Sequence, residues 1–263
     1  MTILKKIIAR KKEDLQQRKA QKFTYELTLL PYYHSETKSL RDNRLNTTRE
    51  VGIIAEMKKA SPSKGVLLAS YDPKVLFKSY QTANVEGISI LTDQPFFQGS
   101  LYDLLEVRSL TVDIPLLCKD FIIDSYQIAE AKGYGASVIL LIASILEESQ
   151  YQEFYYQAKE IGLEVLTEIH NYNDLEKVLK AFVPEMIGVN NRDLATFKTS
   201  LSTTVQLAKE IPDETILISE SGIHSPEQIK QLNKMGVKGV LVGEQLVTSQ
   251  DKLKAIDDLV GSK

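Results

Sequence analysis

Eight short, almost continuously apolar runs constrain the fold of this chain more than any other feature. They begin about 22 to 35 residues apart, the length of a strand followed by a crossover helix. The runs are Gly52–Lys58, Gly87–Asp93, Pro115–Phe121, Val138–Ser144, Glu164–His170, Met186–Arg192, Thr215–Ser221 and Gly239–Gln245. Parallel strands that are covered on both faces have this continuous apolar character. The pattern therefore predicts parallel strands that alternate with helices.

The segments between the runs carry helix signals. Asp72 before Pro73 is a preferred N-cap followed by proline, and Ser225, Pro226 and Gln228 come close to a capping box. The expected helices are Pro73–Asn84, Ser125–Gly133, Glu147–Gly162, Asn173–Ala181 and Ser225–Gly236. Eight strand–helix units in 263 residues predict an α/β fold, a closed (β/α)₈ TIM barrel. An open doubly wound sheet is the alternative, but no GxGxxG motif follows the first run.

The chain begins with a basic segment before the first run. Ile3, Leu4, Ile7, Ile8 and Leu15 fall near helical spacing, so one face of this segment is apolar. The pattern predicts an amphipathic helix packed on the same domain. A helix lying on a membrane surface is the alternative.

Composition excludes several classes of protein. Hydrophobic residues make up 43% and charged residues 25%, which excludes a disordered chain, a collagen and a coiled coil. Lys and Arg number 32 against 35 Asp and Glu, so no basic excess favours nucleic acid or membrane partners. No apolar run approaches the roughly 20 residues that span a bilayer. A single cysteine, Cys118, fits a reducing compartment, and we expect a cytoplasmic protein.

Polar side chains gather at the carboxyl ends of the runs, where barrels of this type build their active sites. They are Glu56, Lys58, Lys119, Glu168, Asn190, Arg192, Glu220 and Ser221. Because side chains alternate along a strand, Glu56 and Lys58 share a face. We expect Lys119 and Glu168 to converge with them over the mouth, where two amines and two carboxylates can divide into acid and base roles. For any one of these residues, a strand-end charge that reaches solvent is the alternative.

A phosphate site is the second predicted constellation. Ser221 and Gly222 end the seventh run and Gly243 lies in the eighth, and phosphate sites of barrels often use these two loops. Glycine lets the backbone approach an anion, and the amides at a helix start favour it. Glu244 is compatible with an anion if only its amide faces it. The loop that begins at Ser61 adds hydroxyls and a lysine and could close as a lid. Each glycine alone could instead be an ordinary turn residue.

The histidines and the cysteine carry no further motif. His34, His170 and His224 have no metal-ligand spacing, so we interpret them as structural or surface residues and expect no metal. Neighbours on a strand point in opposite directions, so Cys118 beside Lys119 is expected to face the helices rather than to act as a nucleophile.

Six segments in order carry a family resemblance. They are GIIAEMKKASPSKG, LLCKDFIID, EVLTEIH, IGVNNRDL, ISESGI and GVLVGE. Together with the start ILKKIIARKKEDL, they resemble the indole-3-glycerol phosphate synthases of tryptophan biosynthesis, from Ile3 to the last helix. The resemblance implies a (β/α)₈ barrel with an extra N-terminal helical segment over the barrel mouth. It implies conversion of 1-(2-carboxyphenylamino)-1-deoxyribulose 5-phosphate to indole-3-glycerol phosphate, with loss of carbon dioxide and water and with no metal or organic cofactor.

The resemblance also implies catalytic roles. Lys119 resembles the general acid that protonates the ketose carbonyl while the aromatic ring carbon attacks it. Glu168 and Lys58 match residues that transfer protons during dehydration, and Glu56 orients them or acts as a base. The sequence leaves open which residue is acid and which is base. Asn190 resembles the residue that hydrogen-bonds the substrate and orients a carboxylate.

Binding roles follow from the same resemblance. Arg192 is expected to bind the substrate's carboxylate or to pair with Asp193, and Glu220 to position Lys58 or a substrate hydroxyl. Phosphate contacts are expected from Lys58, Ser61, Gly222, Gly243 and the amide of Glu244, with Ser221 lining the same end. Aromatic walls for the anthranilate ring are expected from Phe96, Phe97 and Phe121, with plain packing as the alternative.

Two other functions are weighed against this one. A phosphoribosylanthranilate isomerase needs a cysteine–aspartate acid–base pair, which the position of Cys118 disfavours. A barrel that only binds a phosphorylated ligand would not require two buried amine–carboxylate pairs.

We predict one domain over residues 1–263, with an N-terminal extension (1–50) before the barrel (51–263), acting as a monomer or weak homodimer. Within the extension, residues 23–50 are polar and irregular, and their conformation stays open.

Overall fold

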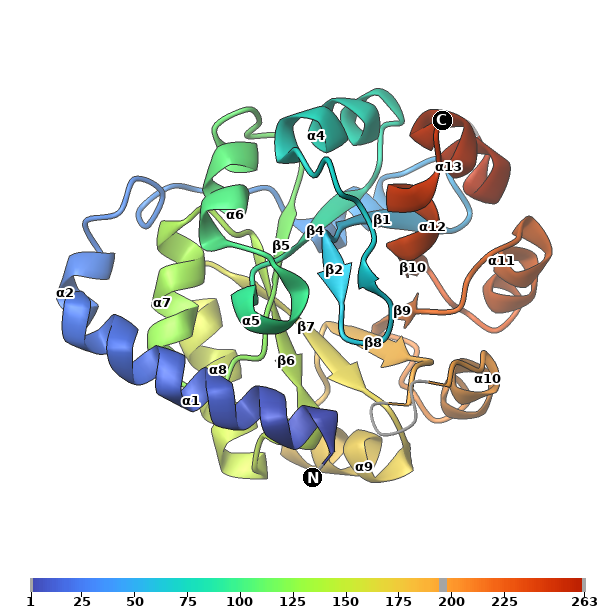
Figure 1. The fold of residues 1–263 in the computed structure, drawn as a ribbon. Helices are drawn as coiled ribbons and strands as arrows, with labels where there is room; N and C mark the ends of the chain where they lie inside the picture. Colours follow the sequence, from blue (N-terminus) through green and yellow to red (C-terminus); the bar gives the residue numbers. More distant parts are fainter. Residues whose placement is uncertain (1, 194–197, 262–263) are drawn as a thin grey trace.

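The computed structural model describes residues 2–193 and 198–261 and contains a closed barrel of parallel strands (Figure 1). The order around the barrel is β1-β10-β9-β8-β7-β6-β5-β4. The strands are β1 (Gly52–Met57), β4 (Gly87–Leu91), β5 (Leu116–Lys119), β6 (Val138–Ile142), β7 (Glu164–Ile169), β8 (Met186–Asn190), β9 (Ile216–Glu220) and β10 (Gly239–Val242). All eight predicted runs are confirmed as strands. Each strand ends one to three residues before its run does, because the polar residues at the ends already belong to the mouth.

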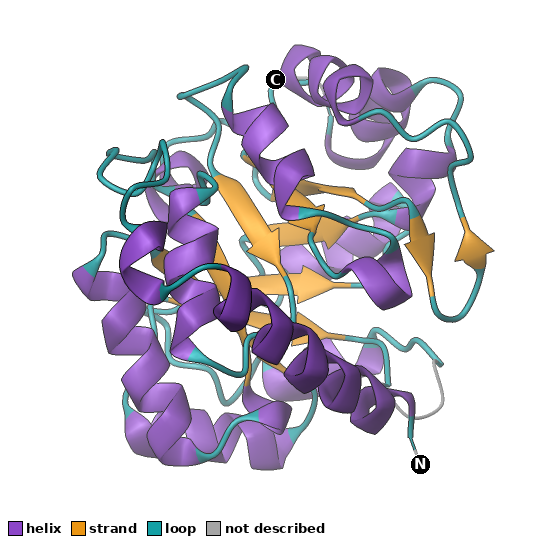
Figure 2. Cartoon of the chain, turned by 60° about the vertical axis from the view of Figure 1, so that its left-hand side comes forward, coloured by secondary structure: helices purple, strands orange, loops and turns teal. Residues whose placement is uncertain are grey.

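Helices surround the barrel and cover the outer face of its strands (Figure 2). They are α4 (Pro73–Thr82), α6 (Leu101–Arg108), α7 (Ser125–Gly133), α8 (Glu148–Glu160), α9 (Tyr172–Ala181), α10 (Ser202–Leu207), α11 (Pro226–Asn233), α12 (Glu244–Thr248) and α13 (Lys252–Val260). The five expected helices are confirmed: α4, α8 and α11 are slightly shorter than expected, α7 has the expected bounds, and α9 begins one residue earlier. Asp72 caps α4 by accepting from the amides of Lys74 and Val75, and Ser225 and Gln228 form the expected capping box of α11.

Three short elements sit in the loops. They are the hairpin of β2 (Ala60–Ser61) and β3 (Gly65–Val66), the helix α5 (Gln94–Phe97) and the 3₁₀ turn η1 (Ala143–Ile145). The hairpin follows β1 and α5 follows β4, so both lie at the carboxyl end of the barrel.

Alternation along the strands decides which side chains reach the mouth. Ile54, Leu117 and Leu166 belong to the apolar cluster inside the barrel, whereas Cys118 belongs to the larger cluster between strands and helices. Two residues beyond an inward position, the next side chain also points inward. Glu56, Lys119, Glu168 and Glu220 stand two residues beyond Ile54, Leu117, Leu166 and Ile218. The strands therefore deliver these four charged side chains to the carboxyl end of the barrel interior.

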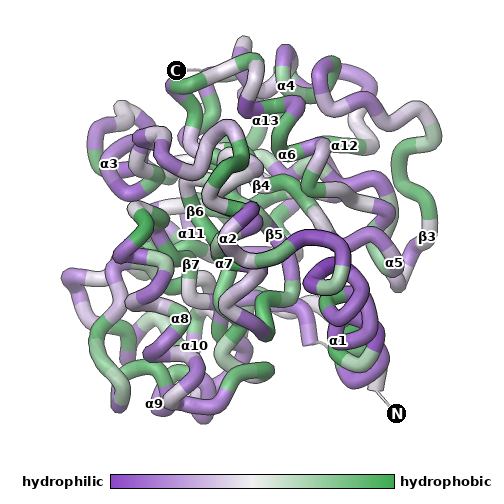
Figure 3. The backbone as a smooth tube through the Cα atoms, turned by 90° about the vertical axis from the view of Figure 1, so that its left-hand side faces the viewer, coloured by the Kyte–Doolittle hydropathy of each residue, from purple (hydrophilic) through white to green (hydrophobic). Residues whose placement is uncertain are grey.

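The first helix, α1 (Ile3–Gln21), crosses the mouth of the barrel (Figure 1). It is mostly hydrophilic (Figure 3), but Ile7 and Leu15 are buried, so the predicted amphipathic helix on the same domain is confirmed. Lys11 is buried as well, and its Nζ lies 2.6 Å from Oδ1 of both Asp93 and Asp120. This buried ion cluster fastens α1 to the loops after β4 and β5.

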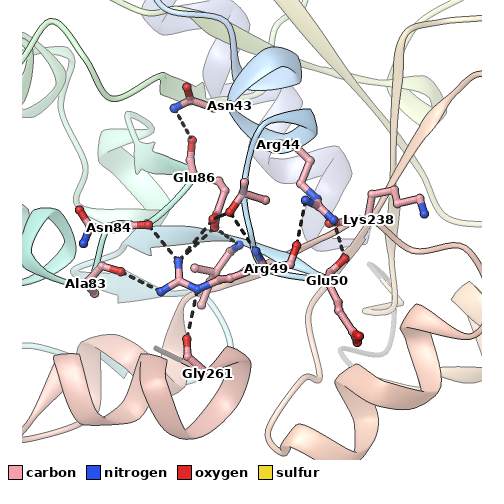
Figure 4. A network of polar contacts seen from close by, with 11 residues as sticks. Asn43, Arg44, Arg49, Glu50, Ala83, Asn84, Glu86, Lys238 and Gly261 are labelled. Atoms are coloured by element: carbon pink, nitrogen blue, oxygen red, sulfur yellow. Dashed lines mark hydrogen bonds and ion pairs between the residues drawn. The ribbon is translucent and has the colours of Figure 1, made fainter. Parts of the chain in front are cut away.

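The rest of the extension leads from the mouth to the opposite end of the barrel. The helix α2 (Thr24–Leu27) packs on α7, and α3 (Leu40–Leu45) lies at the amino ends of the strands. The amide of Leu40 donates to Glu164 at the start of β7 over 2.6 Å, and Arg44 donates to the carbonyl of Lys238 just before β10 (Figure 4). Hydrogen bonds therefore attach residues 40–50 to the barrel.

Candidate active site

A cavity lies at the carboxyl ends of the strands, between the barrel and α1. It gathers residues from all eight strands of the barrel. The predicted site residues that line it are Glu56, Lys58, Ser61, Lys119, Phe121, Glu168, Asn190, Arg192, Glu220, Ser221, Gly222, Gly243 and Glu244. Residues far apart in the sequence thus meet in one hollow, as the position of polar residues at the strand ends predicts.

One predicted residue lies apart from this hollow. Phe96 is half-buried on α5 and does not line the cavity, whereas the neighbouring Phe97, which was also expected there, does. The rings of Phe97 and Phe121 pack with centroids 6.1 Å apart. Ile3, Leu4 and Ile7 of α1 continue this apolar wall. Their helical spacing was visible in the sequence, but their place in the site was not.

Lys119, the last residue of β5, is at the centre of the charged groups. Its Nζ lies 2.5 Å from Oε2 of Glu220 and 3.3 Å from Oε2 of Glu168. Burial lowers the pKa of Lys119, but the surrounding carboxylates, with Glu220 first, raise it above its usual value. Lys119 is therefore an ammonium that forms ion pairs with two carboxylates.

Glu220 contacts Lys119, whereas Lys58 pairs with Glu56, so the structure gives no support to the expectation that Glu220 positions Lys58. Its alternative role at a substrate hydroxyl stays a prediction. Burial raises the pKa of Glu220 to about 7 against the opposing charge of Lys119, and its Oε1 has no hydrogen-bond partner among the described residues. Sequence reasoning missed Gly188, where a Cβ would lie 2.2 Å from this Oε1. A glycine inside an apolar strand was the available signal, because it permits such a close approach.

Glu168 is held through both carboxylate oxygens. Oε2 faces Lys119, and Oε1 lies 3.2 Å from Nε2 of His170. Burial opposes ionisation, but Lys119, His170 and a hydrogen bond from the Asn190 amide outweigh it, and the pKa of Glu168 lies well below its usual range. Asn190 also accepts from the backbone amide of Arg192 over 3.0 Å, which fixes its side chain.

The second amine–carboxylate pair comes from β1 and the residue after it. Lys58 Nζ lies 2.5 Å from Glu56 Oε1, so the predicted shared face is confirmed. Gly243 makes this arrangement possible, because a Cβ at that position would lie 2.1 Å from the same oxygen. Gly243 therefore has a role besides the predicted approach to an anion: it leaves room for Glu56.

The loops after β9 and β10 form the floor of the predicted phosphate site. Ser221 and Gly222 both adopt positive φ angles, 69° and 77°, which turn the backbone sharply at the end of β9. Gly243 directly precedes α12. The carboxylate of Glu244 pairs with Lys64 from the hairpin after β1. The acid is thus engaged by a lysine.

Metal binding and cysteine chemistry find little support in the part of the chain that the structure describes. Within residues 2–193 and 198–261, no three His, Cys, Asp or Glu side chains are grouped so as to hold a metal ion. Cys118 is buried toward the helices as predicted, and burial raises the pKa of its thiol to about 12.

No helix in the described ranges has the length and apolar character to cross a membrane.

Comparisons with known proteins agree with this geometry. The family described as "Indole-3-glycerol phosphate synthase" matches residues 4–259. The indole-3-glycerol phosphate synthase of Bacillus pumilus is 43% identical over 98% of this chain and 100% of its own length. That of Bacillus licheniformis is 44% identical over 98% of this chain and 99% of its own length.

Solved structures of other proteins share the fold of this chain but little of its sequence. The 3-hexulose-6-phosphate synthase of Salmonella typhimurium aligns with a TM-score of 0.64 and 13% identity, over 80% of this chain and 96% of its own. A chain of the tryptophan synthase α2β2 complex of Pyrococcus furiosus aligns with a TM-score of 0.58 and 16% identity, over 81% of this chain and 99% of its own.

Proposed function

Because this chain belongs to the indole-3-glycerol phosphate synthase family, we propose that the charged cluster around Lys119 carries out that family's reaction. The enzyme is a carbon–carbon lyase of tryptophan biosynthesis. It closes the indole ring of 1-(2-carboxyphenylamino)-1-deoxyribulose 5-phosphate, releases carbon dioxide and water, and forms indole-3-glycerol phosphate.

Lys119 is the general acid of ring closure. The aromatic carbon that bears the carboxylate attacks the ketose carbonyl, and the oxygen gains negative charge and takes a proton. The ammonium of Lys119 is held in the cavity by Glu168 and Glu220, at 3.3 Å and 2.5 Å, and is charged at neutral pH. Glu220, with a pKa near 7, is suited to return a proton to Lys119. Loss of carbon dioxide then restores the aromatic ring.

Lys58 and Glu168 carry out the dehydration. The hydroxyl must leave as water with a proton from an acid, and a second proton must pass to a base to form the new double bond. Lys58 is a cation beside the cavity, and Glu168 is an ionised carboxylate. We assign the acid to Lys58 and the base to Glu168, and Glu56 orients Lys58 through their 2.5 Å ion pair.

The substrate is placed by the two ends of the cavity. We assign its phosphate to Ser61, Ser221, Gly222, Gly243 and the amide of Glu244, and its carboxylate to Arg192. The anthranilate ring is assigned to the apolar wall of Phe97 and Phe121. Pairing of the Glu244 carboxylate with Lys64 supports this placement, because it moves negative charge away from the phosphate.

The domain organisation, the compartment and the oligomeric state of the enzyme belong to the same proposal. We assign residues 1–50 and 51–263 to one domain, supported by the buried contacts of Lys11 and Leu15 with the barrel. The near balance of charges supports an enzyme without nucleic-acid or membrane partners, and the single cysteine supports a reducing compartment such as the cytoplasm. We assign it as a monomer or weak homodimer. Light scattering coupled to gel filtration measures the oligomeric state.

One observation carries the proposal: Lys119 contacts two glutamates at the carboxyl end of the barrel. Barrels of this type build their active sites at that end. Lys119→Met should lower the formation of indole-3-glycerol phosphate, measured by fluorescence, by about 10²- to 10⁴-fold. The exposed Lys78 on α4 provides a matched control, and Lys78→Met should retain turnover. Turnover close to that of the original chain in folded Lys119→Met would contradict the assignment.

A further inference from the structure

His170, directly after β7, lies between two carboxylates, and the reaction scheme above leaves it without a role. Its Nε2 is 3.2 Å from Oε1 of Glu168, and its Nδ1 is 3.6 Å from Oδ2 of Asp174. The side chain is 10% exposed. Neither ring nitrogen has the geometry of a hydrogen bond to any described residue, so the two acids contact the ring as ion pairs.

Asp174 is itself fixed by the start of α9. Its Oδ2 accepts from the backbone amide of His170 over 2.9 Å, and its own amide donates to Oδ1 of Asn171, the N-cap residue, over 3.0 Å. The carboxylate therefore lies in a defined place beside the imidazole. Such a third group orients a ring so that its other nitrogen faces a fixed target.

The two charged groups in contact with the ring are both carboxylates. Glu168 faces it from β7 and Asp174 from α9. The further charged groups beyond Glu168 are Lys119 of β5, Glu220 of β9 and Glu56 of β1. Burial lowers the pKa of His170, but Asp174 and Glu168 raise it more, to about 10. The ring is therefore an imidazolium at neutral pH.

We propose that His170 is a positioning residue for Glu168: clamped by Asp174, its imidazolium holds one oxygen of that carboxylate and keeps it ionised while Lys119 transfers its proton. The inference rests on the proposed role of Glu168. When Lys119 gives a proton to the carbonyl oxygen, the cation on Oε2 of Glu168 becomes a neutral amine. A buried carboxylate without a cation binds protons more readily. The second cation on Oε1 prevents this, so Glu168 is still a base when the dehydration begins.

The charge of His170 can be measured without activity. The chain has three histidines, so imidazole ¹⁵N spectra are simple, and the signals lost in His34→Gln and His170→Gln assign two of them. The ordinary pKa of a histidine is about 6.5, whereas His170 should stay doubly protonated past pH 8. Asp174→Asn should lower the pKa of His170 by at least about one unit. Titration of His170 near 6.5 in the original chain would overturn the inference.

Kinetics then separate positioning from mere packing. His170→Gln should lower kcat about tenfold or more with less than a threefold change in KM, and the loss should be larger at pH 6 than at pH 8. His34→Gln serves as the matched control with unchanged kinetics. Glu168→Gln distinguishes a failure of this inference from a failure of the proposed function of Glu168. If it remains active, the proposed function of Glu168 fails; if it is inactive while His170→Gln has the kcat and pH profile of the original chain, the inference alone fails.

Discussion

The two ends of the barrel both contain buried ion pairs, but they use them differently. At the amino end, Arg49 and Glu86 form one pair that makes further hydrogen bonds with the backbone and with the Thr47 hydroxyl (Figure 4). At the carboxyl end, three glutamates share two lysines, and one carboxylate oxygen of Glu220 has no hydrogen-bond partner in the described chain. The comparison shows that the two ends differ in how completely their buried charges are paired, and the less completely paired end is the one to which we assign the reaction.

The amino-end network joins three separated parts of the chain. The guanidinium of Arg49 donates to the carbonyls of Ala83, Asn84 and Gly261 over 2.9, 2.9 and 3.1 Å. Glu86 accepts from the amide of Ile53 at the start of β1 over 2.7 Å. A guanidinium with five donors suits several carbonyls at once. This end therefore ties the extension, the first βα unit and the C-terminus together.

The carboxyl-end cluster instead spreads the pKa values of its carboxylates. Burial raises that of Glu220 to about 7, whereas the pKa of Glu168 is lowered because the cations around it outweigh burial. Similar side chains in one cavity thus differ in protonation, which is the arrangement that assigns acid and base roles. The following predictions test this contrast, beginning with the largest effect.

Lys58→Met should uncouple the two halves of the reaction. Ring closure and decarboxylation depend on Lys119, whereas departure of water needs the acid that we assign to Lys58. Product formation should fall about 10²- to 10⁴-fold, while the release of carbon dioxide in a single turnover falls far less. Chemical quench with detection of both products measures this. Lys59→Met, the neighbouring lysine outside the cavity lining, is the control, and parallel loss of both products in Lys58→Met would contradict the role.

Arg49→Met should reduce stability with little effect on turnover per folded molecule. It leaves the buried Glu86 without its arginine, and breaking a buried pair costs about 3–5 kcal/mol of unfolding free energy. Urea unfolding measures the loss. Arg10→Met removes only exposed ion pairs of α1 and should cost less than about 1 kcal/mol. Equal losses in the two variants would show that the amino-end network does not stabilise the barrel.

Glycines at the two ends should respond differently to alanine. In Gly188→Ala, the new Cβ would displace Glu220, so kcat should fall about 10- to 100-fold, as for other small misplacements of catalytic groups. In Gly239→Ala, at the amino end of β10, the nearest atom is the Ile218 Cγ1 at 3.4 Å, an ordinary contact. We expect normal turnover there. A crystal structure of Gly188→Ala with Glu220 in its original place would rule out this explanation.

The smallest effect is a dependence of stability on pH. A carboxyl whose folded pKa is raised binds a proton more tightly in the folded state, so its contribution is present below its unfolded pKa and is lost as pH rises through the folded value. For Glu220 the loss falls between about pH 4.5 and pH 7. The unfolding free energy should decrease from pH 5 to pH 8. In Glu220→Gln this decrease should be smaller, by on the order of 1 kcal/mol. An identical decrease in both chains would contradict the raised pKa.

Periodicity in the sequence was enough to predict the eight strands and the face on which Glu56, Lys58, Lys119 and Glu168 lie. It was enough because alternation along a strand is a local rule. The partners of these residues were harder to predict. That Glu220 contacts Lys119 depends on the barrel's closure.

Contacts between distant elements lie outside such local rules. Lys11 reads as an ordinary charge of a basic helix, yet it is buried between two aspartates. The pairing of Arg49 with Glu86 depends likewise on how elements pack. Phe96 and Phe97 are neighbours, and only the orientation of α5 decides which ring faces the cavity.

The most direct test of the contrast between the ends is one matched pair of substitutions, Glu220→Gln and Glu86→Gln. Both replace a buried carboxylate by an amide of the same shape, and both variants are measured for kcat and for unfolding free energy. We expect Glu220→Gln to lose kcat by about 10²-fold or more while it keeps its stability near neutral pH, and Glu86→Gln to lose stability while it keeps kcat. Loss of kcat in Glu86→Gln alone, or loss of stability in Glu220→Gln alone, would contradict this division of the barrel.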